Sequence, residues 1–104
     1  MKNHPAKLYV LQFSNELEHF IKIGITTTSV EDRIRNGGKV DYTITKLGEK
    51  SCSLLEAFRT EQRLLDVYTK HRYNPSQRMG GKSECLLPSV ANAILTIING
   101  DINV

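Results

Sequence analysis

Residues 19–35, HFIKIGITTTSVEDRIR, decide the fold, because a strand, a turn and a helix start follow one another within them. Residues 19–25 predict a β-strand whose side chains alternate between two faces. Three isoleucines form one face, and Phe20, Lys22 and Gly24 form the other. A glycine inside a strand often marks a position where a ligand or another backbone comes close. We therefore expect open space beside Lys22.

The second half of this stretch predicts a short helix. Ser29 and Asp32 have the spacing of a capping box, and Val30 and Ile34 follow at helical spacing. Arg33 then falls within about the first turn. Lys22 and Arg33 therefore converge beside a helix start, which is an arrangement suited to an anion.

The flanking segments complete a mixed α/β (α+β) domain. Residues 7–13 predict a strand with mostly apolar side chains on both faces, and the polar turn 14–18 joins it to the next strand as an antiparallel hairpin. Residues 40–47 predict a third strand that Gly48, Glu49 and Lys50 break, and 51–72 predict the longest helix. Pro88 and Ser89 predict the start of a last helix. We expect one domain over residues 1–104.

Composition narrows the class of protein. The two cysteines, Cys52 and Cys85, are far apart and lack partners at metal-ligand spacing, which indicates reduced thiols rather than a zinc site. The sequence shows no signal peptide and no segment of membrane-spanning length, so we expect a cytoplasmic protein with no membrane partner. A net charge of +3 and a pI near 9.0 permit a polyanionic partner without requiring one.

Positive charge is concentrated between Val67 and Ser83, where no acidic residue occurs. Two tyrosines lie among the basic residues of this segment. A solvated basic loop and a nucleic-acid-binding surface both account for the pattern. The candidate nucleic-acid-binding residues are Lys70, His71, Arg72, Arg78 and Lys82.

Two glutamates of the long predicted helix differ in their surroundings. Glu56 projects among charged and polar residues, which indicates the solvent face. Glu61 instead interrupts the middle of the apolar stripe formed by Leu54, Ala57, Phe58, Leu64, Leu65 and Tyr68. A carboxylate there must be compensated. It is either a glutamate at the rim of the core, paired with a cation, or part of a site.

Tyr9, Lys22, Arg33 and Glu61 together suit the hydrolysis of a phosphodiester. The two cations can hold an anion, and one carboxylate is enough to share a Mg²⁺ ion with phosphates and waters. Each residue also has a simpler interpretation. Tyr9 could pack as an ordinary strand tyrosine, Lys22 could extend to solvent from an edge strand, and Arg33 could pair with a neighbouring acid.

The order and spacing of these residues resemble the GIY-YIG nuclease superfamily. The segments that carry the resemblance are Leu8-Tyr9-Val10, Lys22-Ile23-Gly24, Arg33 and Glu61. It is closest to a phage-associated branch with a K-I-G second motif and a late segment similar to residues 81–86, and it covers about residues 7–87. It implies a small three-stranded antiparallel sheet flanked by helices and Mg²⁺-dependent (or Mn²⁺-dependent) cleavage of DNA.

The resemblance also implies roles for individual residues. Tyr9 would help to activate the attacking water, Arg33 would contact the scissile phosphate and Glu61 would bind the metal. Lys22 stands where many members have a second tyrosine, and is better suited to positioning phosphate or water than to acting as a base. Gly37 replaces a histidine found in some members. A late asparagine has no clear match, so Ser83 or Glu84 could give related support, as could Gly24.

The sequence therefore predicts a small metal-dependent DNA endonuclease. A nucleic-acid-binding or regulatory module on the same fold, without turnover, is the alternative, and the missing histidine and the basic segment favour it. Whether two copies form a homodimer to cut both strands stays open.

Overall fold

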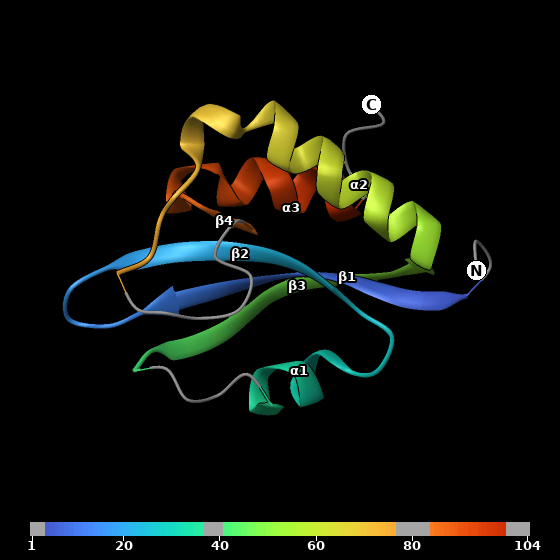
Figure 1. The fold of residues 1–104 in the computed structure, drawn as a ribbon, viewed down its shortest axis with the longest axis horizontal. Helices are drawn as coiled ribbons and strands as arrows, with labels where there is room; N and C mark the ends of the chain where they lie inside the picture. The colour runs from blue at the N-terminus through green and yellow to red at the C-terminus, as the bar shows by residue number, and fades with distance from the viewer. Residues whose placement is uncertain (1–3, 37–40, 77–83, 100–104) are drawn as a thin grey trace.

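The fold is a four-stranded antiparallel sheet with helices on both faces, and its strands lie in the order β3-β1-β2-β4. A computed structural model describes residues 4–36, 41–76 and 84–99. Helices α2 (Leu54–Val67) and α3 (Ala91–Asn99) cover one face, and the short α1 (Val30–Asn36) lies beyond the other (Figure 1). The strands are β1 (Pro5–Ser14), β2 (His19–Thr26), β3 (Thr43–Ser53) and β4 (Cys85–Leu86). The mixed α/β class is confirmed.

Strands β1 and β2 form the predicted hairpin, with Ser14 opposite His19 at its closed end. The side chain of Asn15 holds the turn, because its Oδ1 accepts hydrogen bonds from the backbone N–H groups of Leu17 and Glu18 at 2.8 and 2.9 Å. Both strands extend slightly beyond the predicted bounds of 7–13 and 19–25.

The predicted end of the third strand is wrong. Strand β3 runs to Ser53 and passes through Gly48, Glu49 and Lys50, because it pairs with β1 along its whole length around an irregularity between Val10 and Leu11. Gly48 also has a packing role. A Cβ atom there would lie 2.7 Å from Leu95 Cδ2, so the glycine gives α3 room against the sheet.

Helix α2 is shorter than the predicted helix over 51–72. It begins at Leu54 because Ser53 caps it, with Ser53 Oγ accepting a hydrogen bond from the Glu56 N–H at 3.1 Å. It ends at Val67, and a 3₁₀ helix, η1 (Thr69–His71), follows. The last helix likewise begins as a 3₁₀ turn, η3 (Pro88–Val90), before α3.

The two-residue strand β4 was not predicted, so the sheet has one strand more than the expected three. Cys85 lies opposite Lys22, and Leu86 lies opposite Ile21. The Tyr73 N–H donates to the Cys85 carbonyl at 3.0 Å on the other edge of β4. A strand of this length carries no periodic signal, and only its pairing with β2 defines it.

The alternation along β1 and β2 fills both faces of the sheet, as predicted. Leu8, Val10 and Ile23 pack with α2 and α3 in one buried cluster, which we call the helix-side core. Tyr9 and Phe20 belong to a second cluster on the opposite face, together with Leu11, Phe13, Val30 and Cys85. Cys85 is buried and Cys52 is half-buried, and the two do not form a disulfide.

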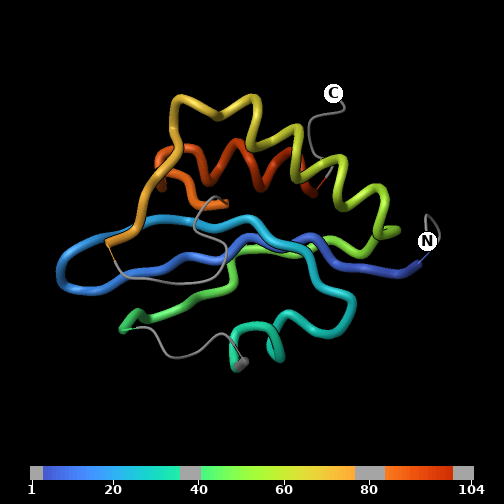
Figure 2. Tube along the Cα trace, in the orientation of Figure 1, coloured from blue at the N-terminus to red at the C-terminus, as the bar shows by residue number. Residues whose placement is uncertain are grey.

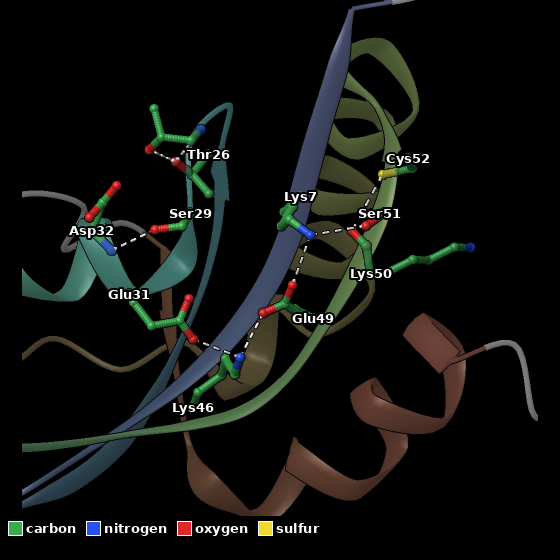
Figure 3. Close-up of polar contacts among 11 residues, drawn as sticks. Lys7, Thr26, Ser29, Glu31, Asp32, Lys46, Glu49, Lys50, Ser51 and Cys52 are labelled. Atoms are coloured by element: carbon green, nitrogen blue, oxygen red, sulfur yellow. Dashed lines mark hydrogen bonds and ion pairs between the residues drawn. The ribbon is translucent and has the colours of Figure 1, made fainter.

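A chain of ion pairs lies between α1 and the sheet (Figure 3). Lys46 Nζ contacts Glu31 Oε2 at 2.9 Å and Glu49 Oε1 at 2.7 Å, and Lys7 Nζ contacts Glu49 Oε2 at 3.2 Å. At the start of α1, Ser29 Oγ accepts a hydrogen bond from the Asp32 N–H at 3.0 Å, which confirms the predicted cap. These contacts hold the short helix against the sheet.

Among the helices of the described ranges, none is long and apolar enough to cross a membrane.

The carboxylate of Glu18 joins the β1–β2 hairpin to the segment after η1. It accepts hydrogen bonds from the Tyr73 hydroxyl at 2.5 Å, from Ser76 Oγ at 2.6 Å and from the Tyr42 hydroxyl. The hydrogen bonds from Ser76, Tyr42 and Tyr73 lower the pKa of Glu18 to about 2. The ionised form therefore holds these segments together.

We expect Glu18→Gln to lower the melting temperature at neutral pH. The pKa of Glu18 is lowered in the folded protein, so its contribution is complete above the ordinary value of 4.5 and disappears as the pH falls towards about 2. Circular dichroism melts of the two proteins should converge between pH 4.5 and 2. Glu16→Gln, in the same turn but exposed, is the control. A constant difference between Glu18→Gln and wild type across this range would contradict the assignment.

Candidate active site

The site begins with a contact between Tyr9 and Gly24, which lie opposite each other on β1 and β2. A Cβ atom at position 24 would lie 2.3 Å from both Cζ and Oη of Tyr9, so the ring lies directly over the glycine. The ring therefore extends from β1 over the neighbouring strand β2, and its hydroxyl also lies over Gly24. The open space expected beside Lys22 is filled by this ring.

Arg33 on α1 approaches the same hydroxyl. Its guanidinium donates a hydrogen bond to the phenol oxygen, and both this bond and its charge favour the ionised phenolate. Tyr9 is only 1% exposed, however, and burial is the larger effect, so the pKa of Tyr9 is raised above its ordinary value. The phenol is therefore protonated at neutral pH.

Glu61 enters the site from α2, on the other face of the sheet. Its residue exposure is 5%, as its place in the apolar stripe predicts, whereas Glu56 is exposed. Burial, followed by the charge of Glu84, raises the pKa of Glu61 to about 7. Gln62 Nε2 donates to Glu61 Oε1 at 3.3 Å, and the charge of Lys22 also favours the ionised form, but these effects are smaller.

Glu84 is the partner of Glu61. It directly precedes β4, whose Cys85 lies opposite Lys22, so the pairing of β4 with β2 places Glu84 beside the edge of β2. A hydrogen bond links the two glutamate side chains. The sequence suggested Glu84 only as support, because nothing in residues 83–87 predicted a strand that would carry it to Glu61.

The fold thus brings most of the predicted site together. Arg33, Glu61 and Glu84 each act electrostatically on Tyr9, and the charges of Glu84 and Lys22 act on Glu61. These side chains come from β1, β2, α1, α2 and the start of β4, and they meet at the edge of β2. Gly24 supports the site by admitting the ring of Tyr9.

Three of the predicted nucleic-acid-binding residues, Lys70, His71 and Arg72, follow the end of α2, and Arg72 forms an isolated antiparallel bridge with Leu86 of β4. Lys70 and Arg72 are exposed, and Arg72 Nε donates to the Leu65 carbonyl at 3.4 Å. His71 is half-buried with its ring edge towards Tyr68. Arg78, Lys82 and Ser83 lie outside the described residues, as does Gly37 at the position of the missing histidine. The binding role of this group stays a prediction.

The donor set at the edge of β2 fits a hard divalent cation. Within residues 4–36, 41–76 and 84–99, no three histidine, cysteine or carboxylate side chains gather as a metal-binding group. Glu61 and Glu84, however, form a carboxylate pair whose mutual repulsion contributes to the raised pKa of Glu61. Mg²⁺ is commonly held by one or two carboxylates, and a cation would relieve this repulsion.

Comparison with known proteins identifies no relative: no family model, curated protein or solved structure matches this chain.

We expect Gly24→Ala to destabilise the protein by about 1–3 kcal/mol, because the new methyl group would overlap the buried Tyr9 ring. Gly48→Ala should cost less, since its methyl group would meet only the end of the flexible Leu95 side chain. Urea unfolding of the three proteins measures the difference. Equal stability of wild type and Gly24→Ala would show that the Tyr9 ring does not lie over residue 24.

In the absence of divalent ions, Glu61→Gln should be more stable than wild type at pH 8. The pKa of Glu61 is raised in the folded protein, so wild type loses stability as the pH rises from 4.5 through about 7. We expect the gap in melting temperature between Glu61→Gln and wild type to widen by about 4 °C or more from pH 5 to pH 8 in EDTA.

The matched control is Glu56→Gln, an exposed position on the same helix, which should follow wild type at both pH values. Adding Mg²⁺ or Mn²⁺ at pH 8 should reduce the advantage of Glu61→Gln, because only wild type has both carboxylates. If the difference in melting temperature between Glu61→Gln and wild type does not change with pH, Glu61 does not have a raised pKa.

Proposed function

We propose that this protein is a small metal-dependent endonuclease that hydrolyses DNA phosphodiester bonds. The observation that carries the proposal is the convergence of Tyr9, Lys22, Arg33, Glu61 and Glu84 at one edge of the sheet. The simpler interpretations treat Tyr9 as an ordinary core residue and Glu61 as a glutamate paired with a cation at the rim of the core. Neither explains why both side chains interact with Glu84.

Arg33 is suited to bind the scissile phosphate. It is exposed, so a polyanion can reach it, and its position is fixed by the hydrogen bond to Tyr9. A guanidinium can hold two phosphate oxygens at once. Lys22 is half-buried on β2 beside β4 and adds a second positive charge on the carboxylate side of the site. The two cations therefore approach the reacting group from different directions.

Tyr9 acts in this proposal as a protonated group. Because burial raises its pKa, its hydroxyl can donate a hydrogen bond to the attacking water or to a phosphate oxygen. In hydrolysis the water oxygen bonds to phosphorus, one P–O ester bond breaks and the water loses a proton. That proton passes to solvent, and the departing ester oxygen takes up a proton from solvent, because Glu61 and Glu84 are needed as ionised metal ligands in this proposal.

Glu61 and Glu84 are also the residues that would hold Mg²⁺ or Mn²⁺. The ion would supply positive charge to offset the negative charge that develops on the phosphate. Glu61 is buried, Glu84 is half-buried and Arg33 is exposed, so in this proposal the glutamates would hold the metal ion and Arg33 would bind the DNA. Membership of the GIY-YIG superfamily and a cytoplasmic location are parts of the same proposal.

Purified protein with supercoiled plasmid and Mg²⁺ should produce nicked DNA, and EDTA should abolish the reaction. We expect Arg33→Ala and Glu61→Gln each to lower the rate by about 100-fold or more, because each removes a group that stabilises transition-state charge. Glu56→Gln and Arg59→Ala, exposed positions on α2, are matched controls and should retain activity.

Two other results would decide against turnover at this site. Nicking that persists unchanged in Glu61→Gln would indicate a contaminating nuclease. DNA binding that weakens steeply with salt, with no nicking by wild type under any divalent ion, would favour a nucleic-acid-binding module without turnover. The exposed Lys70 and Arg72 supply charge for that alternative.

A further inference from the structure

A groove of about 680 Å³ opens beside the candidate active site. Ile25 at the end of β2 and Leu54, Leu55 and Phe58 at the start of α2 form its apolar lining, and Arg33 lines it from α1. Figure 2 shows the β2–α1 turn and the first turn of α2 at the same end of the molecule, as the shared lining requires. The groove is therefore bounded by three separate elements.

Phe58 is the unusual residue of the groove. It belongs to the apolar stripe of α2, and the sequence predicts that it faces the core, yet it is 53% exposed, so this prediction is wrong. Its neighbour Ala57 is fully buried, which shows that α2 turns its core-facing side away from Phe58. The Phe58 ring is thus exposed in the groove, while the opposite side of α2 is buried against the sheet.

The groove and the candidate active site are continuous. Arg33 contributes to both, because it hydrogen-bonds the Tyr9 phenol and lines the groove. Phe58 and Glu61 lie three positions apart on α2, and side chains at this spacing are neighbours on a helix surface. A strand of DNA whose phosphate rests on Arg33 would therefore have its adjacent base close to Phe58.

We propose that this groove binds an unpaired nucleobase next to the scissile phosphate, with the base stacked on Phe58. The inference rests on the proposed nuclease function. Among the described residues that line the groove none is acidic, one is the cation Arg33, and the aromatic ring of Phe58 is exposed. A flat base attached to an anionic phosphate matches each of these features, and base–aromatic stacking is a common means of binding single strands.

This arrangement selects a class of substrate. A base inside a perfect duplex is stacked and paired, so it would have to leave the helix to enter the groove, at a cost in free energy. The free-energy cost is much smaller for an unpaired base in a bulge, a flap or a frayed end. The groove therefore favours DNA with an unpaired nucleotide at the site of cleavage over fully paired DNA.

The test measures binding in a Glu61→Gln background, which preserves the DNA, with two labelled duplexes of equal length. One is fully paired and the other contains an unpaired 2-aminopurine. Fluorescence anisotropy should show that adding Phe58→Ala weakens binding of the unpaired substrate by about tenfold and changes binding of the paired one by less than about twofold. Quenching of 2-aminopurine on binding should also be lost, and Phe58→Trp should keep both signals.

Val67→Ala is the matched control, because Val67 is 66% exposed on the same helix but does not line the groove. It should leave both affinities unchanged. Equal weakening of both DNAs by Phe58→Ala, or no effect on either, overturns base stacking while the plasmid assay can still support the nuclease. A concentration-dependent dimer that Phe58→Ala dissociates would assign the groove to a second copy and also overturn the proposal. If neither DNA binds, both proposals fail.

Discussion

The contact between the Tyr9 ring and Gly24 is the constraint on which the rest of the site depends. Tyr9 belongs to the cluster of side chains on the α1 side of the sheet, whereas Glu61 comes from α2 on the opposite side. Side chains on opposite faces of a sheet are normally kept apart by it. Because Gly24 has no Cβ, the ring lies over β2, where the charges of Glu61 and Glu84 act on its hydroxyl. Side chains from both faces of the sheet therefore contribute to one site beside β2.

The charges at this edge explain why both a phosphate and a divalent cation suit it. Lys22 and Arg33 carry positive charge, and Glu61 and Glu84 carry negative charge when both are ionised. Burial makes that ionised pair costly, so the pKa of Glu61 rises to about 7. A phosphate bound to Arg33 would add further negative charge, and a divalent cation beside the glutamates would compensate for it. The two ligands therefore favour each other electrostatically.

Much of this arrangement could be predicted from residue periodicity, and the exceptions have physical reasons. Alternation along β1 and β2 identified which face Tyr9 and Phe20 occupy, and the helical period identified Glu61 as buried and Glu56 as exposed. Glu84 could not be placed, because β4 exists only through its pairing with β2. The length of β3 depended in the same way on pairing with β1, which overrides the local preference of Gly48. Phe58 was wrongly predicted to face the core. Periodicity shows which side of a helix is apolar, but it does not show how much of that side is covered by other elements.

Helix α2 links the chemistry of the site to its surroundings. Ala57, Leu64 and Leu65 are buried against the sheet, and the Ser53 cap fixes the start of the helix, so α2 cannot rotate or slide without disrupting the core. A rigid element holds functional side chains more precisely in place than a loop does. Glu61 and the groove residue Phe58 project from this one helix, while Arg33 lines the groove from α1, which the Glu31–Lys46 ion pair links to β3. The carboxylate and the exposed ring therefore keep a fixed spacing, and under the proposed function a DNA strand would have to conform to that spacing.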